Sequence, residues 1–135
     1  MNDQTLTPDQ ALARVDHLIR DTATVLTPMP RLELITFGTE ANECPSPAAE
    51  GSITINRAYW LRDIPKHENL RISQQVRDHW QARGHRITGF GGEGSPNLSG
   101  ESQPDRYILA LSRAEGDNLY LAATSPCISP TQPTR

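Results

Sequence analysis

The sequence predicts a two-layer α+β sandwich in which two helices cover one face of a mostly antiparallel sheet. Apolar residues recur at helical spacing over residues 7–26 and 68–83, and they alternate with polar residues in the stretches between and after them. The expected order is α-β-β-α-β-β-β, and strands that follow one another directly favour antiparallel pairing. A length of 135 residues fits one domain. We expect this domain over residues 7–130, with disordered ends at 1–6 and 131–135.

The first helix has a clear start and stop in the sequence. Thr7 at the N-cap, Pro8 at the first helical position and Gln10 at the third form a capping-box pattern. The segment "TPMP" at 27–30 ends the helix. One apolar stripe at three- and four-residue spacing is made by Leu12, Val15, Leu18, Ile19, Thr22 and Leu26.

Two strands are expected next, at 31–38 ("RLELITFG") and 51–64 ("GSITINRAYWLRDI"), with a loop around Cys44 between them. In the longer strand one side is formed by Ile53, Ile55, Arg57, Tyr59 and Leu61. The other side is formed by Thr54, Asn56, Ala58 and Trp60. If the first side packs on the helices, Trp60 lies on the open face of the sheet, unless a loop or the tail covers it.

The second half of the chain is expected to add one helix and three strands. The helix runs from about Glu68 to Arg83, and Gly84 suits a left-handed C-terminal cap. Its buried side is marked by Leu70, Ile72, Val76 and Trp80. The segment "HRITGF" predicts a strand, and residues 91–104 predict a loop. The runs "DRYILALSR" and "NLYLAATS" flank "AEGD" and predict a hairpin.

The charge balance and hydropathy exclude two classes of partner. The net charge is -3, which gives no reason to expect nucleic acid or an anionic membrane surface. No window of about 18 apolar residues exists, so no transmembrane segment is expected. The first ten residues lack a basic and an apolar region. This fits either a cytosolic protein or a mature domain whose leader has been removed.

The loop "GFGGEG" matches the glycine spacing of a dinucleotide-binding fingerprint through Gly89, Gly91 and Gly94. That fingerprint requires a helix to start at the last glycine, so that its N–H groups meet the pyrophosphate. Here Ser-Pro-Asn follows without a helical pattern. We therefore interpret the segment as a loop between strands and expect no cofactor.

The histidines do not predict a metal site or a catalytic set. His79 and His85 are six residues apart, so they do not share a helical face as paired ligands would. Cys127 follows a strand rather than beginning a helix, which disfavours a reactive thiolate. No G-x-S-x-G elbow is present. An enzyme would need a pocket in which His79 or His85 lies within hydrogen-bond reach of a carboxylate.

Cys44 and Cys127 both occupy polar, proline-bounded segments, where a free buried thiol would gain little by packing. A disulfide between them is favoured over two unpaired thiols in a cytosolic protein. Closing a loop of about 80 residues contributes about 4.5 kcal/mol in the chain-entropy model. A bridge would indicate an oxidising compartment.

Several segments resemble a family of small actinobacterial secreted proteins, similar to the mycobacterial LppA-type lipoproteins. They are "YWLRDIP" at 59–65, the helix end at 80–88 and the stretch from "PDRYILALSR" to "SPCISP" at 104–130, together with Cys44. The resemblance covers about residues 7–130. It implies an extracytoplasmic setting, a Cys44–Cys127 bridge and a lipid anchor in the full-length form, but no known activity. Members typically begin with a signal peptide and a lipobox cysteine, and this chain shows neither.

Together these patterns predict a non-enzymatic cell-envelope domain that binds a protein or an envelope component. The expected binding surface combines Asn56, Trp60 and Arg62 on the open face with Gly91 and Gly92 in the glycine-rich loop. One alternative is an inhibitor or immunity protein that blocks a toxin or a hydrolase. Another is an envelope-acting hydrolase that uses a histidine and carboxylates brought together by the fold.

Overall fold

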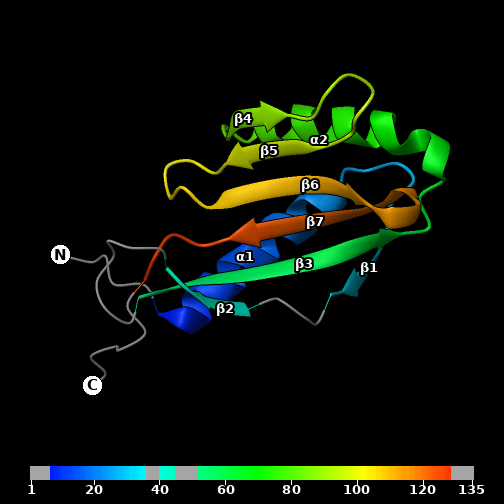
Figure 1. Ribbon diagram of the computed structural model, residues 1–135. Helices are drawn as coiled ribbons and strands as arrows, with labels where there is room; N and C mark the ends of the chain where they lie inside the picture. The colour runs from blue at the N-terminus through cyan, green and yellow to red at the C-terminus, as the bar shows by residue number, and fades with distance from the viewer. Residues whose placement is uncertain (1–6, 36–39, 45–51, 129–135) are drawn as a thin grey trace.

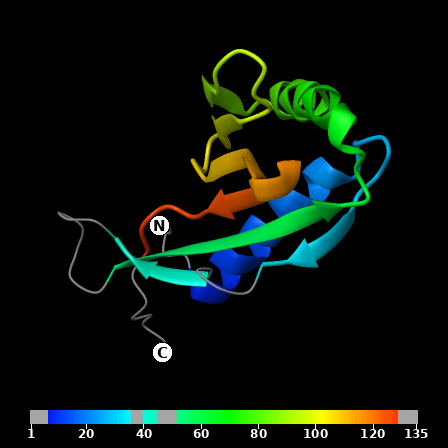
Figure 2. The ribbon, with the colours of Figure 1, turned by 45° about the vertical axis from the view of Figure 1, so that its right-hand side comes forward.

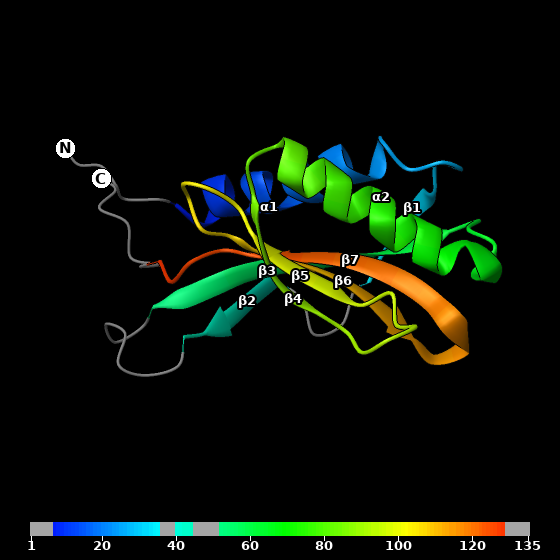
Figure 3. The same ribbon diagram turned by 90° about the horizontal axis from the view of Figure 1, so that it is seen from above.

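The computed structural model describes residues 7–35, 40–44 and 52–128, with only the backbone described at 40–43. Helices α1 (Pro8–Ala23) and α2 (Asn69–Ala82) lie on the same side of one sheet, as the view from above shows (Figures 1 and 3). Every strand pair in the sheet is antiparallel. The predicted two-layer α+β sandwich is therefore confirmed.

The sheet has seven strands in the order β1-β3-β7-β6-β5-β4, and β2 also pairs with β3. The strands are β1 (Arg31–Leu34), β2 (Glu40–Glu43), β3 (Ile53–Arg62), β4 (Arg86–Phe90), β5 (Leu98–Glu101), β6 (Ile108–Ala114) and β7 (Asn118–Thr124). Short 3-10 turns, η1 (Lys66–Glu68) and η2 (Glu115–Asp117), precede α2 and close the predicted β6–β7 hairpin. The outer strand on one side is β4, and β1 and β2 share the other side.

The start of α1 follows the sequence pattern, but its end does not. The Thr7 hydroxyl accepts from the Gln10 N–H at 3.0 Å, and the Gln10 side chain accepts from the Thr7 N–H at 2.9 Å. This is the predicted capping box. The helix ends at Ala23, whereas the apolar stripe continues to Leu26. Leu26 is still buried, because the turn after the helix folds it back into the core.

The long strand β3 alternates as predicted. Ile55, Tyr59 and Leu61 are buried on the side of the helices, and Trp60 lies on the opposite side. Helix α1 packs on β3 and β7, while α2 packs on β4 and β5 (Figure 2). The two helices therefore cover different halves of the same face.

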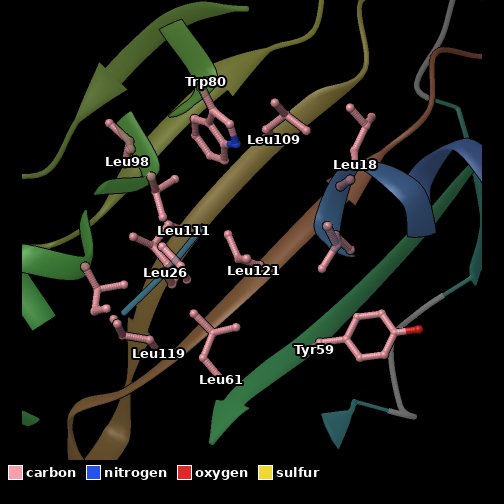
Figure 4. Packing of buried hydrophobic residues seen from close by; sticks show 14 of the residues in the cluster. Leu18, Leu26, Tyr59, Leu61, Trp80, Leu98, Leu109, Leu111, Leu119 and Leu121 are labelled. Atoms are coloured by element: carbon pink, nitrogen blue, oxygen red, sulfur yellow. The ribbon is translucent and has the colours of Figure 1, made fainter. Parts of the chain in front are cut away.

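The core lies between the helices and the sheet and centres on leucines from β5, β6 and β7 around Trp80 (Figure 4). Trp80 is 1% exposed, and its indole N–H donates to the Thr22 hydroxyl at 2.9 Å. A Cβ at Gly100 would lie 3.1 Å from Trp80 Cε3, so a side chain there would push the ring or the strand by a few tenths of an ångström. Leu98, Leu109, Leu111, Leu119 and Leu121 complete this centre.

The prediction that Leu70 marks the buried side of α2 is wrong, because its side chain is 54% exposed. The buried stripe is Ile72, Val76 and Trp80, at four-residue spacing. Leu70 precedes Ile72 by two positions and therefore points away from this stripe. Gly84 adopts a φ of 83°, which confirms the left-handed cap after the helix.

Two strands were missing from the predicted order. The segment 91–104 was expected to be a loop, but it contains β5 (Leu98–Glu101), which pairs with β4 and β6. Likewise, β2 (Glu40–Glu43) lies in a segment expected to be a loop. Both strands are short and carry few residues with high β-propensity. They form because neighbouring strands offer hydrogen-bond partners, which a local pattern does not report.

The disulfide between Cys44 and Cys127 is formed, with 6.1 Å between the two Cα atoms. It joins the residue after β2 to the segment after β7. This segment also stays bonded to β3, because the Ser125 hydroxyl accepts from the Ile55 N–H and Ile128 exchanges two backbone hydrogen bonds with Ile53, all at 2.8 Å. The expected disordered ends at 1–6 and 131–135 lie outside the described residues.

Candidate binding surface

A row of side chains crosses the face of the sheet that lies opposite the helices. Register pairs Glu33 of β1 with Trp60 of β3, Trp60 with Tyr120 of β7, and Tyr120 with Ser112 of β6. Residues that are paired in register point to the same face. The four side chains therefore form one line across four neighbouring strands.

The row continues to the glycine-rich loop. Asn97 comes just before β5, and its side-chain oxygen accepts from the Arg113 N–H at 2.8 Å, next to Ser112. The Gly91 N–H donates to the Asn97 carbonyl oxygen, also at 2.8 Å. The loop and the aromatic residues thus belong to one surface, which we call the open-face row: Glu33, Trp60, Tyr120, Ser112, Asn97 and Gly91.

Trp60 is half-buried and held in place by its neighbours. The Tyr120 ring meets it edge to face, with 5.7 Å between centroids and 87° between planes. The Arg62 guanidinium lies 5.0 Å from the Trp60 ring centroid. Arg62 is itself fixed by Glu33, whose Oε1 accepts from Arg62 Nε at 2.7 Å. That hydrogen bond, followed by the charge of Arg62, lowers the pKa of Glu33.

Beside the aromatic pair the surface is hollowed. A depression of about 320 Å³ lies over β4, β5 and β6. Small side chains make up most of the lining, which consists of Gly89, Phe90, Gly91, Asn97, Leu98, Ser99, Ala110 and Ser112. The open face therefore offers a fixed aromatic platform next to a shallow site with hydroxyl and amide groups.

The structure brings together most of the predicted surface but separates one residue from it. Trp60, Arg62 and Gly91 lie on or beside the open-face row, and Gly92 follows Gly91 in the loop. Asn56 lies near the other end of β3, where it pairs with Thr124. Its Oδ1 atom is buried without a hydrogen-bond partner among the described residues.

Tyr120 and Ser112 were not predicted as site residues, since their position beside Trp60 depends on the strand order. Alternation within β7 could have put Tyr120 on the face opposite Leu119 and Leu121. It could not have shown which strand lies next to β3. The interpretation that a loop or the tail covers Trp60 concerns residues 36–39, 45–51 and 129–135, which lie outside the described part of the chain.

The loop glycines have structural reasons for their presence. A Cβ at Gly91 would lie 2.8 Å from Ser95 Cβ and 3.0 Å from Asn97 Cβ, so the loop packs too tightly for a side chain. Gly94 has a φ of 81°, a left-handed conformation that favours glycine. The chain then enters strand β5 rather than a helix. The geometry of the dinucleotide fingerprint is therefore not formed here.

A charged cleft of about 380 Å³ lies on the helix side, and it bears on the condition set above for an enzyme. Its lining residues are Arg14, His17, Leu18, Asp21, Arg83, His85 and Gln103. Asp21 lies 2.8 Å from His79 Nε2, so a histidine is within hydrogen-bond reach of a carboxylate at the cleft wall. This pair brings together α1 and α2 residues that are 58 positions apart.

The charges of this cleft are matched within the protein. Burial would raise the pKa of Asp21, but hydrogen bonds from Arg83 and His79 and their charges bring it below its usual value. Both carboxylate oxygens of Asp21 are engaged, since Arg83 binds them at 2.8 and 3.0 Å. Burial, followed by the charge of Arg14, lowers the pKa of His85. His85 Nδ1 is buried without a hydrogen-bond partner among the described residues.

The lining of the cleft contains no hydroxyl or thiol that could act as a nucleophile. Over residues 7–35, 40–44 and 52–128, no three histidine, cysteine or acidic side chains are grouped so that they could hold a metal ion. The cleft therefore offers acid–base groups and cations. A reaction there could use an activated water as the nucleophile.

Comparison with known proteins leaves the function to be inferred from the residues themselves. No family model matches the sequence, and neither a curated protein nor a solved structure matches it. Within the described part of the chain, neither helix has the length and apolar character needed to cross a membrane.

Proposed function

We propose that this chain is a non-enzymatic binding domain that works outside the cytoplasm and holds a protein or an envelope component on the open face of its sheet. The observation that carries the proposal is the open-face row, in which Trp60 and Tyr120 stand on the face opposite both helices. A binding domain needs no reacting groups. It needs a surface that keeps its shape when the partner arrives.

The physical character of the row supports binding. Tryptophan, tyrosine and arginine are enriched at the centres of interfaces. The two aromatic side chains bury much area with few rotatable bonds, and the planar arginine guanidinium can stack on a ring and donate several hydrogen bonds. Trp60 is already held by Tyr120 and Arg62, so little conformational freedom is lost on binding. Strand spacing makes the face about 24 Å wide from β1 to β4, which suits an extended ligand or a flat protein surface.

The proposed setting outside the cytoplasm rests on the disulfide and on the resemblance to envelope lipoproteins. A bridge between residues 83 positions apart persists in oxidising compartments and is rare in the reducing cytosol. A lipid tether on the full-length form would hold the domain at the membrane surface, where its open face could meet envelope components. An inhibitor or immunity protein would use the same surface, with a toxin or a hydrolase as the partner.

Photo-crosslinking in cells with an intact envelope tests this proposal. Benzoylphenylalanine in place of Ser112 reports on the open face, and the same group in place of the exposed Gln81 on α2 is the matched control. We expect a discrete adduct from position 112, none from position 81, and loss of the adduct when Trp60→Ala is added. Identical adducts from both positions, or an adduct that survives Trp60→Ala, would contradict the proposal.

An envelope-acting hydrolase is the second candidate, favoured by the Asp21–His79 pair at the wall of the charged cleft. In that function a histidine would activate a water molecule against a bond of an envelope polymer. Incubation of the purified protein with peptidoglycan distinguishes the candidates. Release of soluble fragments by the wild type but not by Asp21→Asn, with folding checked by circular dichroism, would favour the hydrolase. We expect no release from either protein.

A further inference from the structure

A second groove lies on the helix side, between α2 and the loop that joins β4 to β5. Its volume is about 270 Å³, and its lining includes Leu70, Gln74 and Arg77 of α2 and Phe90 at the end of β4. Leu70 is 54% exposed and Phe90 is 64% exposed. Two large, exposed apolar side chains that line one groove mark a surface suited to an apolar ligand group.

Arg77 gives this groove an unbalanced positive charge. Its guanidinium lies 5.5 Å from the Phe90 ring centroid and donates to Gln74 Oε1 at 2.6 Å. The nearby Asp78 is bonded to Gln74 instead, at 2.9 Å. Every other arginine in the described part of the chain forms a salt bridge with a carboxylate, and Arg77 forms none there.

The groove runs beside a free strand edge. Strand β4 is the outermost strand, and β5 is its one partner among the described strands. The Gly91 N–H bonds to Asn97, and Phe90 pairs with Leu98 at the next position. Hydrogen-bonded and non-bonded pairs alternate in an antiparallel ladder, so the N–H and C=O of Phe90 are directed away from β5. Such an edge can accept another strand.

We propose that this groove binds an extended segment of a partner protein, which adds as a strand along β4. The segment carries an apolar side chain that packs between Leu70 and Phe90, and a carboxylate that pairs with Arg77. Main-chain hydrogen bonds to the edge supply affinity, and the two side-chain contacts supply specificity. The carboxylate is required by charge complementarity, since a guanidinium lying on an aromatic ring lacks an acidic partner here.

This binding site adjoins the open face at Gly91 and Asn97 of the β4–β5 loop, but its anchoring residues Leu70 and Arg77 belong to α2 and take no part in the open-face row. Trp60 and Tyr120 take no part in the groove. A failure of one proposal therefore leaves the other standing, and substitutions at Trp60 and Arg77 tell them apart.

Selection of displayed peptides on the purified, oxidised protein tests the inference. The probe is a random eight-residue library with free carboxyl ends, and selected sequences are then synthesised and titrated by calorimetry. We expect enrichment of peptides with an apolar residue next to an acidic residue or the terminal carboxylate. Arg77→Gln should weaken their binding about tenfold or more. The same change at Arg71, on the same helix but paired with Glu68, should not.

Amide hydrogen exchange tests the added strand directly. A bound peptide should protect the Phe90 amide, which the ladder leaves unbonded in the free protein, and Trp60→Ala should bind the peptide normally. The proposal is overturned if no peptide is enriched, if selected peptides bind Arg77→Gln as well as the wild type, or if the Phe90 amide stays unprotected. It is also overturned if sedimentation shows a dimer that Phe90→Ser abolishes, since the occupant would then be a second copy.

Discussion

The two faces of the sheet are built from the same strands and have opposite characters. On β6 and β7, Leu111 and Leu121 are buried against the helices, while the adjacent Ser112 and Tyr120 stand half-exposed on the open face. Alternation of side chains lets one backbone serve both. The covered face stabilises the fold, and the open face is free to carry residues selected for another purpose.

The charged groups at the cleft and at the groove differ in a similar way. At the cleft between the helices, Asp21 holds both His79 and Arg83, so the charges are balanced within the protein. At the groove beside β4, Arg77 lies on Phe90 without an acidic partner in the described part of the chain. The presence of charge is common to both sites. The two sites differ in pairing. The charges at the cleft bond to one another and support the fold, whereas Arg77 at the groove has no carboxylate partner in the described part of the chain, which suits the binding of an acidic ligand.

The largest predicted effect is a loss of unfolding free energy on removing Trp80, to be compared with the smaller loss on removing Trp60. Trp80→Ala removes the centre of the core and should lower the free energy of unfolding by about 3–5 kcal/mol. Trp60→Ala removes the edge-to-face contact with Tyr120 and the cation–π contact with Arg62 on the open face, and should lower it by about 1–2 kcal/mol. Urea unfolding followed by circular dichroism measures both. Equal losses would mean that Trp60 serves the fold, and the contrast between the faces would be wrong.

The disulfide should give the next largest effect. It anchors the end of β7, which supplies residues to both faces, to the segment after β2. The double variant Cys44→Ser with Cys127→Ser should lose about 2–4 kcal/mol of unfolding free energy, because its unfolded chain is less restricted.

Reduction with dithiothreitol provides the control for this prediction. The wild type should fall to the stability of the double variant when reduced, and the double variant should not respond. A wild type whose urea midpoint is insensitive to reduction would contradict the stabilising role of the bridge.

The sequence predicted the parts of this fold that depend on local patterns. The capping box of α1, the alternation of β3, the glycine cap at Gly84 and the final hairpin could all be read within short windows. Strands β2 and β5 could not, because they exist through pairing with strands distant in sequence. Leu70 was misplaced because it is apolar although it lies two positions from Ile72, and therefore on a different side of the helix.

The site was predictable to a smaller degree. Alternation alone put Trp60 on the open face, but the strand order was needed to add Tyr120 and Ser112 to it. Arg77 looked like any other arginine in the sequence. It became distinctive once ten other arginines were seen to have carboxylate partners in three dimensions.

The smallest predicted effect concerns the charged cleft and should appear as a dependence of the unfolding free energy on pH. Burial and the charge of Arg14 lower the pKa of His85, against smaller opposing effects of Asp105 and Asp21. The unfolded state therefore binds more protons than the native state once the pH falls through the ordinary histidine value of about 6.5. The stability contributed by neutral His85 is complete above this pH and is lost as the pH falls toward the lowered folded pKa.

His85→Gln should flatten this part of the curve of unfolding free energy against pH, measured by urea unfolding between about pH 7 and 5. The matched control is His67→Gln, because the His67 side chain is 80% exposed and lies outside the cleft. Loss of stability below about pH 4 should persist in both variants, because Asp16, Asp21 and Asp105 have lowered pKa values and must then be protonated. If His85→Gln kept the wild-type slope of unfolding free energy against pH above pH 5, His85 would be as well solvated in the native protein as in the unfolded chain. The cleft would then not contrast with the groove at Arg77 in the way described above.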